Sequence, residues 1–388
     1  MSIQINPNFL GKIKSYGASK INLCFNCGNC TATCPFSFKF DSIIPRKLIR
    51  YAVIGAEDAI LASPEVWLCY ECEDCSTACP RQANPNVIIR AIKKYAIARY
   101  SGPLYRFAEK MMTSLSVLIG TNILLTMVFL SLITIALSLG YGVMNLSEVD
   151  LATFLPTEYI HNFGLLLGAY IGIMLINGIY TQWKLMRNYV TQQTKKRNWI
   201  SAIIGTLVDE IVTQKRHLYC GSKHRWVAHF LILWGFLGLG LATFLSFIFN
   251  SDFGYYPPII PDLSKVSTAS LWELIESLSL QLISFIGLIS GIALLLGLMI
   301  MIYRKVVGLA FENHFSDWYF VILLVIADTS GLLTLAGRAL SLLPWVYYFY
   351  VVHLISVAIL IVMAPFSRFA HSVYRFFTIL LLKRNCYA

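Results

Sequence analysis

The sequence predicts an all-α protein made of two parts, a water-soluble helical part followed by a bundle of six membrane-spanning helices. The chain has 388 residues, of which 57% are hydrophobic and only 13% are charged. This composition excludes an ordinary soluble protein. Six long apolar segments follow residue 113, and the more polar region before them has a helical period. We place the boundary after residue 110, which gives predicted domains 1–110 and 111–388.

Each of the six apolar segments is about as long as the helix that crosses a bilayer core. The predicted spans are 114–141, 160–183, 226–249, 279–303, 317–340 and 346–367. Nine Lys and Arg residues lie between the second and third spans, whereas the segment 144–159 has none and the segment 250–278 has only Lys265. Because positive residues mark the cytoplasmic side, we expect both termini and the N-terminal domain in the cytoplasm. The net charge of +11 is therefore explained by membrane topology, and we expect no nucleic-acid partner.

Eight of the ten cysteines spell the motif CxxCxxCxxxCP twice. A cubane [4Fe-4S] cluster needs four thiolates, and in two-cluster proteins the fourth cysteine of each run crosses to the other cluster. Crossing assigns Cys24, Cys27, Cys30 and Cys79 to cluster one, and Cys69, Cys72, Cys75 and Cys34 to cluster two. Zinc sites or disulfides are the alternatives, but the spacing favours clusters, which need a reducing compartment.

The segment between the two cysteine runs has the period of a helix. Apolar residues recur at steps of three and four over 41–63, with Asp41 and Ser42 as candidate caps, and a second helix is predicted over 87–100. These segments predict a helical two-cluster ferredoxin domain rather than one built on strands.

Four of the seven histidines lie where haem b would need axial ligands. His353 and His371 are eighteen residues apart, about five turns of one helix, so both face one way at a separation of roughly 27 Å. His229 and His371 lie at a similar depth in the membrane, which makes them the predicted ligands of an inner haem. His161 and His353 lie at a similar depth on the other side and are the predicted ligands of an outer haem, so we expect one or two haems. The alternative is that these are helix-end histidines. His217, His224 and His314 are expected at the surface, although His224 is a second candidate for the inner ligand.

Asp328 lies near the middle of the fifth predicted span, where an unpaired carboxylate is costly. It is a candidate to bond a haem propionate, a quinone carbonyl or a moving proton, and the alternative is a protonated side chain bonded to Thr329. Catalytic residues are otherwise not identified by the sequence. Cys220 and Cys386 belong to neither motif, and we expect them to be inert or lipid-modified thiols.

The segment from Tyr350 to His371, with Pro365, Phe366, Ser367 and Arg368 before its second histidine, resembles the last helix of the gamma subunit of respiratory nitrate reductase. That protein is a dihaem cytochrome b that oxidises quinol. The resemblance implies haem ligands at His353 and His371, and His229 matches that family's inner-haem ligand. Leu239 stands where the family carries a further histidine. The second ligand of the outer haem, His161, therefore rests on depth alone.

The cysteine half resembles the C subunits of heterodisulfide reductases, and the membrane half resembles their E subunits. A fusion of the two in this order is similar to the C subunits of quinone-interacting membrane-bound oxidoreductases. The resemblance implies a helical ferredoxin domain followed by a cytochrome b-like bundle in the inner membrane. It also implies menaquinone or another quinone as substrate, cytoplasmic flavin and iron-sulfur subunits as partners, and adenylylsulfate reductase in sulfate or sulfur metabolism as electron donor or acceptor.

Two alternatives stay open. One is the membrane arm of a heterodisulfide reductase-like or sulfite reduction-associated complex, in which a partner would reduce disulfides because this chain has no Cys-Cys-Gly motif. The other is a membrane transporter or redox sensor without haem.

Overall fold

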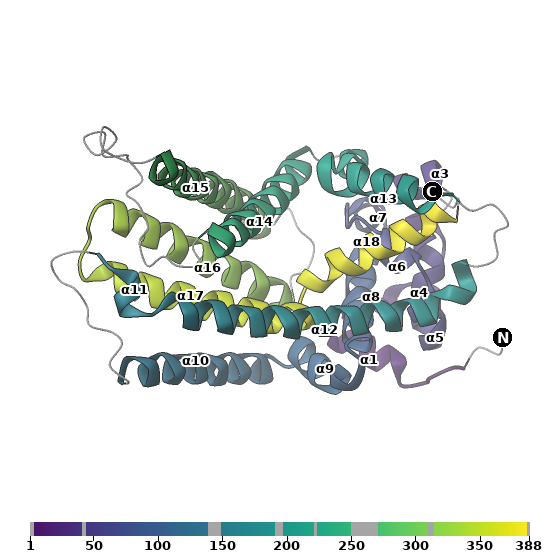
Figure 1. Ribbon diagram of the computed structural model, residues 1–388. Helices are drawn as coiled ribbons and strands as arrows, with labels where there is room; N and C mark the ends of the chain where they lie inside the picture. The colour runs from purple at the N-terminus through teal and green to yellow at the C-terminus, as the bar shows by residue number, and fades with distance from the viewer. Residues whose placement is uncertain are drawn as a thin grey trace.

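The computed structural model describes residues 4–40, 44–138, 149–190, 197–220, 223–249, 271–308 and 314–385. Every regular element in these residues is helical, and they contain no strand, which confirms the predicted all-α class. Short helices gather at one end of the molecule and long helices at the other (Figure 1). The chain therefore has the two-part build expected from its hydropathy.

Short helices packed around one long central helix form the N-terminal part. The central helix is α8 (Pro85–Tyr100), which begins at a proline, whose missing N–H costs nothing at that position. Its Ile92 and Tyr95 are fully buried in one core with Trp67. The surrounding elements are α1 (Phe9–Ser15), η1 (Ile21–Leu23), α2 (Asn29–Ala32), α3 (Pro35–Phe40), α4 (Pro45–Ile54), α5 (Glu57–Ala62), α6 (Glu65–Leu68) and α7 (Asp74–Thr77).

The helical segment predicted over 41–63 is two helices, α4 and α5. Pro45 occupies the first turn of α4, and Gly55 ends it with φ of 78°. A Cβ atom at Gly55 would lie 2.2 Å from the carbonyl oxygen of Asn6, so only glycine fits this turn. The cap candidates Asp41 and Ser42 lie outside the described residues.

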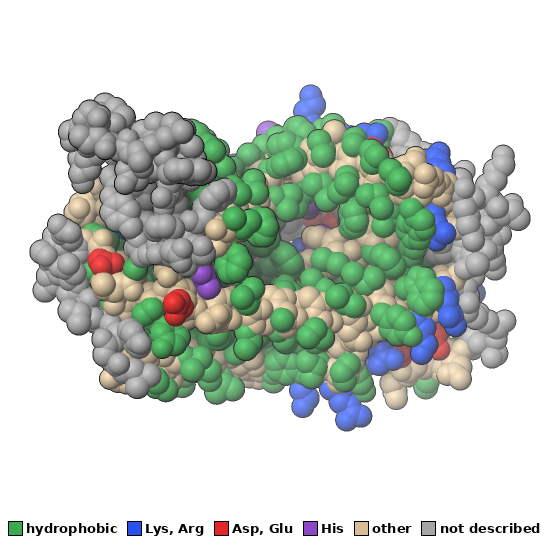
Figure 2. Space-filling model, viewed as in Figure 1, with side chains coloured by type: hydrophobic (Ala, Val, Ile, Leu, Met, Phe, Trp, Pro, Cys, Tyr) green, Lys and Arg blue, Asp and Glu red, His purple; other side chains and the backbone are tan. Residues whose placement is uncertain are grey.

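Six helices are long and apolar enough to cross a membrane, in the order that the sequence predicts. They are α10 (Leu115–Ser138), α12 (Thr157–Val190), α14 (Lys223–Phe249), α15 (Leu271–Val306), α16 (Phe315–Ala339) and α17 (Trp345–Met363). No more than 44% of the most apolar part of any of them is buried in the protein. Their outward surface is largely hydrophobic, as a surface in contact with lipid requires (Figure 2).

Shorter elements precede, connect or follow these helices. They are η2 (Gly102–Leu104), α9 (Tyr105–Thr113), α11 (Leu151–Phe154), α13 (Trp199–Thr206), η3 (Leu207–Val212), η4 (Lys215–Tyr219), η5 (Ala364–Phe366) and α18 (Phe369–Arg384). The boundary predicted after residue 110 falls inside α9 and stays a prediction.

The last span does not continue as one helix to His371. α17 ends at Met363, and Pro365, which has no N–H to donate, lies in the single turn η5. Ser367 is extended, with φ of −121° and ψ of −178°, and α18 then starts in a new direction (Figure 1). The expectation that His353 and His371 share one face of one straight helix is therefore wrong.

The long helices enter the core of the N-terminal part at the joint between the two parts. Met186 of α12 and Tyr374 of α18 belong to the same buried cluster as Trp67 and Tyr100. Gln182 of α12 is fully buried and donates a hydrogen bond through Nε2 to the carbonyl oxygen of Tyr374 at 3.0 Å. The joint is thus a packed interior rather than a flexible linker.

Candidate redox centres

The two cysteine runs have the same backbone conformation. Asn26 and Gly28 have positive φ in the first run, and Glu71 and Glu73 have positive φ at the matching positions of the second. A four-residue helix, α2 or α7, follows each loop. The backbone N–H of Glu71 also donates a hydrogen bond to Sγ of Cys69 at 3.4 Å, a contact that stabilises a thiolate.

Most thiols of the two runs are partly or fully buried, whereas Cys27 is exposed. Burial raises the pKa of Cys69 to about 11, and burial with the neighbouring Cys24 raises the pKa of Cys30 to about 11. Burial also raises the pKa of Cys75, and Cys69 and Cys72 add to the shift. Such thiols lose their protons readily only to a metal cation, which the iron of a cluster would supply. None of the nine cysteines in the described residues forms a disulfide.

Two contacts bring the end of each run toward the other run. Cys34 lies in a group of buried hydrophobic side chains against which Cys72 packs. Burial, together with the nearby Cys72, raises the pKa of Cys34. In the opposite direction, Asn29 donates a hydrogen bond through Nδ2 to the carbonyl oxygen of Ala78, the residue before Cys79. Both contacts agree with the crossed ligand sets, which stay a prediction.

Replacing Cys79 with serine should remove cluster one and spare cluster two, because crossing gives Cys79 to the first run. We expect the variant to keep about half of its iron. Its remaining EPR spectrum should match that of Cys27→Ser and differ from that of Cys72→Ser. If the spectrum of Cys79→Ser matches that of Cys72→Ser instead, the ligand sets are not crossed.

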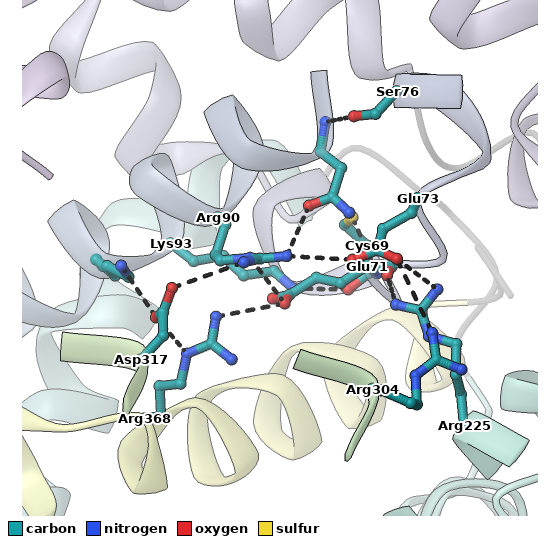
Figure 3. A network of polar contacts seen from close by, with 12 residues as sticks. Cys69, Glu71, Glu73, Ser76, Arg90, Lys93, Arg225, Arg304, Asp317 and Arg368 are labelled. Carbon is teal, nitrogen blue, oxygen red and sulfur yellow. Dashed lines mark hydrogen bonds and ion pairs between the residues drawn. The ribbon is translucent and has the colours of Figure 1, made fainter. Parts of the chain in front are cut away.

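Ion pairs hold the second cysteine loop against those ends of the long apolar helices that lie nearest the N-terminal part (Figure 3). Glu71 pairs with Lys93 at 3.0 Å and with Arg368 at 3.5 Å. Glu73 pairs with Arg225 at 3.7 Å and with Arg304 at 4.0 Å. Arg225 lies in the first turn of α14, Arg304 lies in the last turn of α15, and Arg368 directly precedes α18. The loop predicted to carry cluster two is therefore fixed to the membrane half at three helix ends.

Asp317, in the first turn of α16, is the acidic centre of the same network. It is only 1% exposed and pairs with Lys94 at 3.0 Å, Arg368 at 3.0 Å and Arg90 at 3.6 Å. The basic residues Arg90, Lys93 and Lys94 of α8 are thus buried and paired with carboxylates from both halves. Such a network is stable only when every charge in it is paired.

Three of the four predicted haem ligands use Nδ1 in a hydrogen bond. His353 Nδ1 lies 2.9 Å from the carbonyl oxygen of Ala327, and His371 Nδ1 donates to the carbonyl oxygen of Arg368. His229 Nδ1 lies 2.8 Å from Oε1 of Gln214. Because these oxygens accept, Nδ1 carries the proton and Nε2 keeps the lone pair that iron binds. The Nε2 atoms of these three histidines are therefore chemically suited to bind haem iron.

His217 lies beside the inner histidines, although the sequence analysis places it at the surface. Its ring centroid is 4.4 Å from that of His229 and 4.9 Å from that of Tyr70. Burial, reinforced by His229, lowers the pKa of His217 well below its usual value, and burial lowers the pKa of His371 to about 3. The rings of His217 and His229 are thus in contact, and burial favours the neutral form of His217 and His371. The sequence carries no periodic signal for His217, because it lies in the five-residue 3₁₀ helix η4, which is too short for one.

The two predicted ligands of the outer haem, His161 and His353, lie at the other end of the bundle and contact different helices. His161 of α12 makes an edge contact with Phe247 of α14, with ring centroids 5.0 Å apart. His353 lies against α16, where a Cβ atom at Gly331 would come within 2.8 Å of its Cε1 atom. The surface between α12 and α14 is hollowed (Figure 2). The role of His161 stays a prediction.

Asp328 is 5% exposed, and its Oδ2 atom has no hydrogen-bond partner among the described residues. Thr329 instead donates to the carbonyl oxygen of Val325 at 2.6 Å, so it does not supply the partner proposed in the alternative interpretation. Asp328 faces Gly291 of α15, where a Cβ atom would lie 3.3 Å from its Oδ1 atom. A buried carboxyl oxygen without a partner fits a proton-holding or ligand-bonding role.

Comparisons with known proteins identify the N-terminal part. Residues 20–83 match the family of 4Fe-4S dicluster domains. Over 63 residues the chain is 36% identical to the C subunit of the "H(2):CoB-CoM heterodisulfide,ferredoxin reductase" of Methanothermobacter thermautotrophicus and of Methanothermobacter marburgensis, which covers 16% of this chain and 34% of theirs. It is 30% identical over 89 residues to a protein of Archaeoglobus profundus that is like the C subunit of heterodisulfide reductase, which covers 23% of this chain and 47% of that one.

The chain thus spans between 34% and 47% of the length of these curated relatives. No solved structure matches it. The comparisons therefore establish a 4Fe-4S dicluster domain, related to the C subunit of heterodisulfide reductase, joined to six helices of membrane-crossing length.

Proposed function

We propose that the protein carries electrons between a quinone in the membrane and cytoplasmic protein partners, through haem b and two [4Fe-4S] clusters. The observation that carries this proposal is the attachment of the second cysteine loop to the membrane half. Arg375 lies one turn after His371 in α18 and donates through Nη1 to the carbonyl oxygen of Cys69 at 3.3 Å. The predicted inner haem and cluster two therefore have neighbouring ligands.

The exposure of the two cysteine loops supports an order for the centres. Cys27 of the first run is exposed, whereas Cys75 of the second is buried. Phe25, two residues before Cys27, is 70% exposed. The guanidinium carbon of Arg81 lies 4.3 Å from the centroid of the Phe25 ring. A partly apolar, basic rim suits a soluble partner with an acidic surface. We therefore assign cluster two to the membrane side and cluster one to the exchange of electrons with a partner.

A cavity of about 590 Å³ between α10 and α16 is a candidate for the quinone. Its lining is apolar apart from a few groups, among them Tyr319, whose hydroxyl donates to Oδ1 of Asn122 at 2.8 Å. A quinone has a lipophilic ring and carbonyl oxygens that accept hydrogen bonds, so its site needs an apolar lining with a few polar groups. Asp328 is the candidate for holding a proton deeper in the membrane.

The partners follow from the resemblance to quinone-interacting membrane-bound oxidoreductases. They are cytoplasmic flavin and iron-sulfur subunits, with adenylylsulfate reductase as the electron donor or acceptor in sulfate or sulfur metabolism. The similarity to the C subunit of heterodisulfide reductase favours a second candidate, the membrane arm of a heterodisulfide reductase-like complex. Purifying the native complex and identifying its subunits distinguishes the two.

Adding a water-soluble menaquinol analogue to the purified, oxygen-free protein tests the proposal. We expect the absorbance band of reduced haem b first, followed by the EPR signals of the reduced clusters. In Cys72→Ser, which should lack cluster two, the haem should still be reduced while cluster one stays oxidised. A purified protein with clusters but no b-type band would contradict the proposal and favour a redox sensor without haem.

A further inference from the structure

Helices α13 and η3 carry their large apolar side chains outward. Ala202 is 1% exposed and Thr206 is 0% exposed, so small side chains of this segment face the interior. Its large apolar side chains are between 38% and 64% exposed, and they are Ile200, Ile203, Ile204, Leu207, Val208 and Val212. A helix on the surface of a soluble protein has the opposite arrangement, so an apolar environment must cover this face.

The outward apolar face of α13 and η3 continues the surface of α14. Trp226 of α14 donates a hydrogen bond through Nε1 to the carbonyl oxygen of Thr213 at 3.1 Å, which places the end of η3 beside the start of α14. Val227 of α14 is also exposed, and hydrophobic side chains cover the visible surface from α14 to α13 (Figure 2). Because α14 has the length and composition of a membrane-spanning helix, the lipid around α14 is the cover that this continuity indicates.

Two tryptophans with arginines over their rings mark where this apolar surface ends. The guanidinium carbon of Arg384 lies 3.8 Å from the centroid of the Trp199 ring in α13. In α12, the guanidinium carbon of Arg187 lies 5.6 Å from the centroid of the Trp183 ring. Both tryptophans are exposed. Tryptophan and basic side chains gather at the boundary between the apolar core of a bilayer and its headgroups. The start of α13 and the basic end of α12 therefore lie at the level of the lipid headgroups.

A cavity of about 380 Å³ lies beside α13 at this level. Its lining includes four cations and one carboxylate, which are Arg197, Lys215, Arg216, Lys383 and Asp209. Asp209 pairs with Lys215 at 2.6 Å and with Lys383 at 2.5 Å. Arg216 pairs with Glu210 at 3.4 Å. Among the described residues the four cations thus meet two carboxylates, and the cavity suits an anion.

We propose that this cavity binds the phosphate group of an anionic phospholipid, whose acyl chains lie along the outward apolar face of α13 and η3. The hydroxyls of Ser201 and Tyr219 also line the cavity and can donate hydrogen bonds to phosphate oxygens. Lys215 belongs to η4 and Lys383 to α18, so the headgroup links both elements to α13. Inorganic phosphate offers the same oxygens but leaves the apolar face uncovered. The proposal needs neither haem nor clusters, so it stands apart from the proposed function.

Native mass spectrometry of the full-length protein in detergent, titrated with phosphatidylglycerol, tests the site. Arg197→Gln combined with Lys215→Gln removes two exposed cations and leaves Lys383 to pair with Asp209. A basic side chain near a lipid surface contributes about fivefold to the affinity, so we expect the first phosphatidylglycerol to bind about thirtyfold more weakly. Arg106→Gln combined with Lys110→Gln, at exposed positions of α9, is the matched control and should weaken binding by less than about threefold.

Two further measurements separate the lipid from other occupants. Ile200→Ser combined with Ile204→Ser should weaken phosphatidylglycerol binding, because it makes the outward face polar, and should leave the binding of inorganic phosphate, measured by calorimetry, unchanged. Unchanged lipid binding in this variant would overturn the proposal in favour of a phosphate-only site. Equal affinity for phosphatidylcholine, or equal losses in the cation variant and its control, would overturn it in favour of unspecific lipid contact. A native complex that retains no phosphatidylglycerol because a partner subunit covers α13 would overturn it in favour of a protein interface.

Discussion

Replacing His353 with alanine should remove one b-type haem from the protein and leave the other haem and both clusters in place. The hydrogen bond from Nδ1 to the carbonyl oxygen of Ala327 at 2.9 Å fixes the ring and leaves Nε2 free to bind the iron of the proposed haem. Alanine has no atom that can replace it. We expect about half of the haem to be lost from the purified protein, measured by haem extraction and by the reduced-minus-oxidised spectrum.

Two variants control this experiment. His224 is exposed in the first turn of α14, so His224→Ala should keep both haems. His371→Ala should remove the other haem, with a different spectrum for the one that remains. Unchanged haem content in His353→Ala would contradict the ligand assignment. The outer pair has its own test, because an intact low-spin outer haem in His161→Ala would show that another ligand, or none, is used.

The features that the sequence predicts well are those encoded by neighbouring residues. The two cysteine runs, each ending in Cys-Pro, predict the 4Fe-4S domain because four-thiolate clusters require that local spacing. The six spans follow from unbroken apolar length. Pro365 is a sequence signal for the break between α17 and α18. The eighteen-residue spacing of His353 and His371 predicts one continuous helix only when that proline is ignored.

Other features depend on partners far along the chain. Glu71 and Glu73 occupy left-handed positions that cost such residues about 1–3 kcal/mol each, where the first run has Asn26 and Gly28. Arg368, a partner of Glu71, is nearly three hundred residues away. A local sequence pattern cannot reveal that these carboxylates attach the second cysteine loop to arginines of the long helices. The same reason explains why the sequence predicts His217 at the surface, although it lies in the short helix η4 against His229.

The largest loss of stability is expected from Asp317→Asn. The substitution removes the carboxylate that pairs with Lys94 and one of the carboxylates that pair with Arg90 and Arg368, and Asp317 is only 1% exposed. Removing one partner of a buried ion pair costs about 3–5 kcal/mol, because the remaining charge stays buried and unpaired. The measurement is thermal unfolding of the purified protein in detergent. Asp58→Asn, at an exposed position of α5, is the matched control and should change stability by less than about 0.5 kcal/mol.

A double substitution separates the loss of charge balance from the loss of packing. In Asp317→Asn combined with Lys94→Gln, the cation 3.0 Å from the carboxylate is removed together with it. Fewer unpaired charges then remain in the joint, so the combined loss should be smaller than the sum of the two single losses. Additive losses would mean that the two side chains act independently. The buried charges at the joint would then be held by packing and water, and the ion pairs would not be what fixes the cysteine loop to the membrane helices.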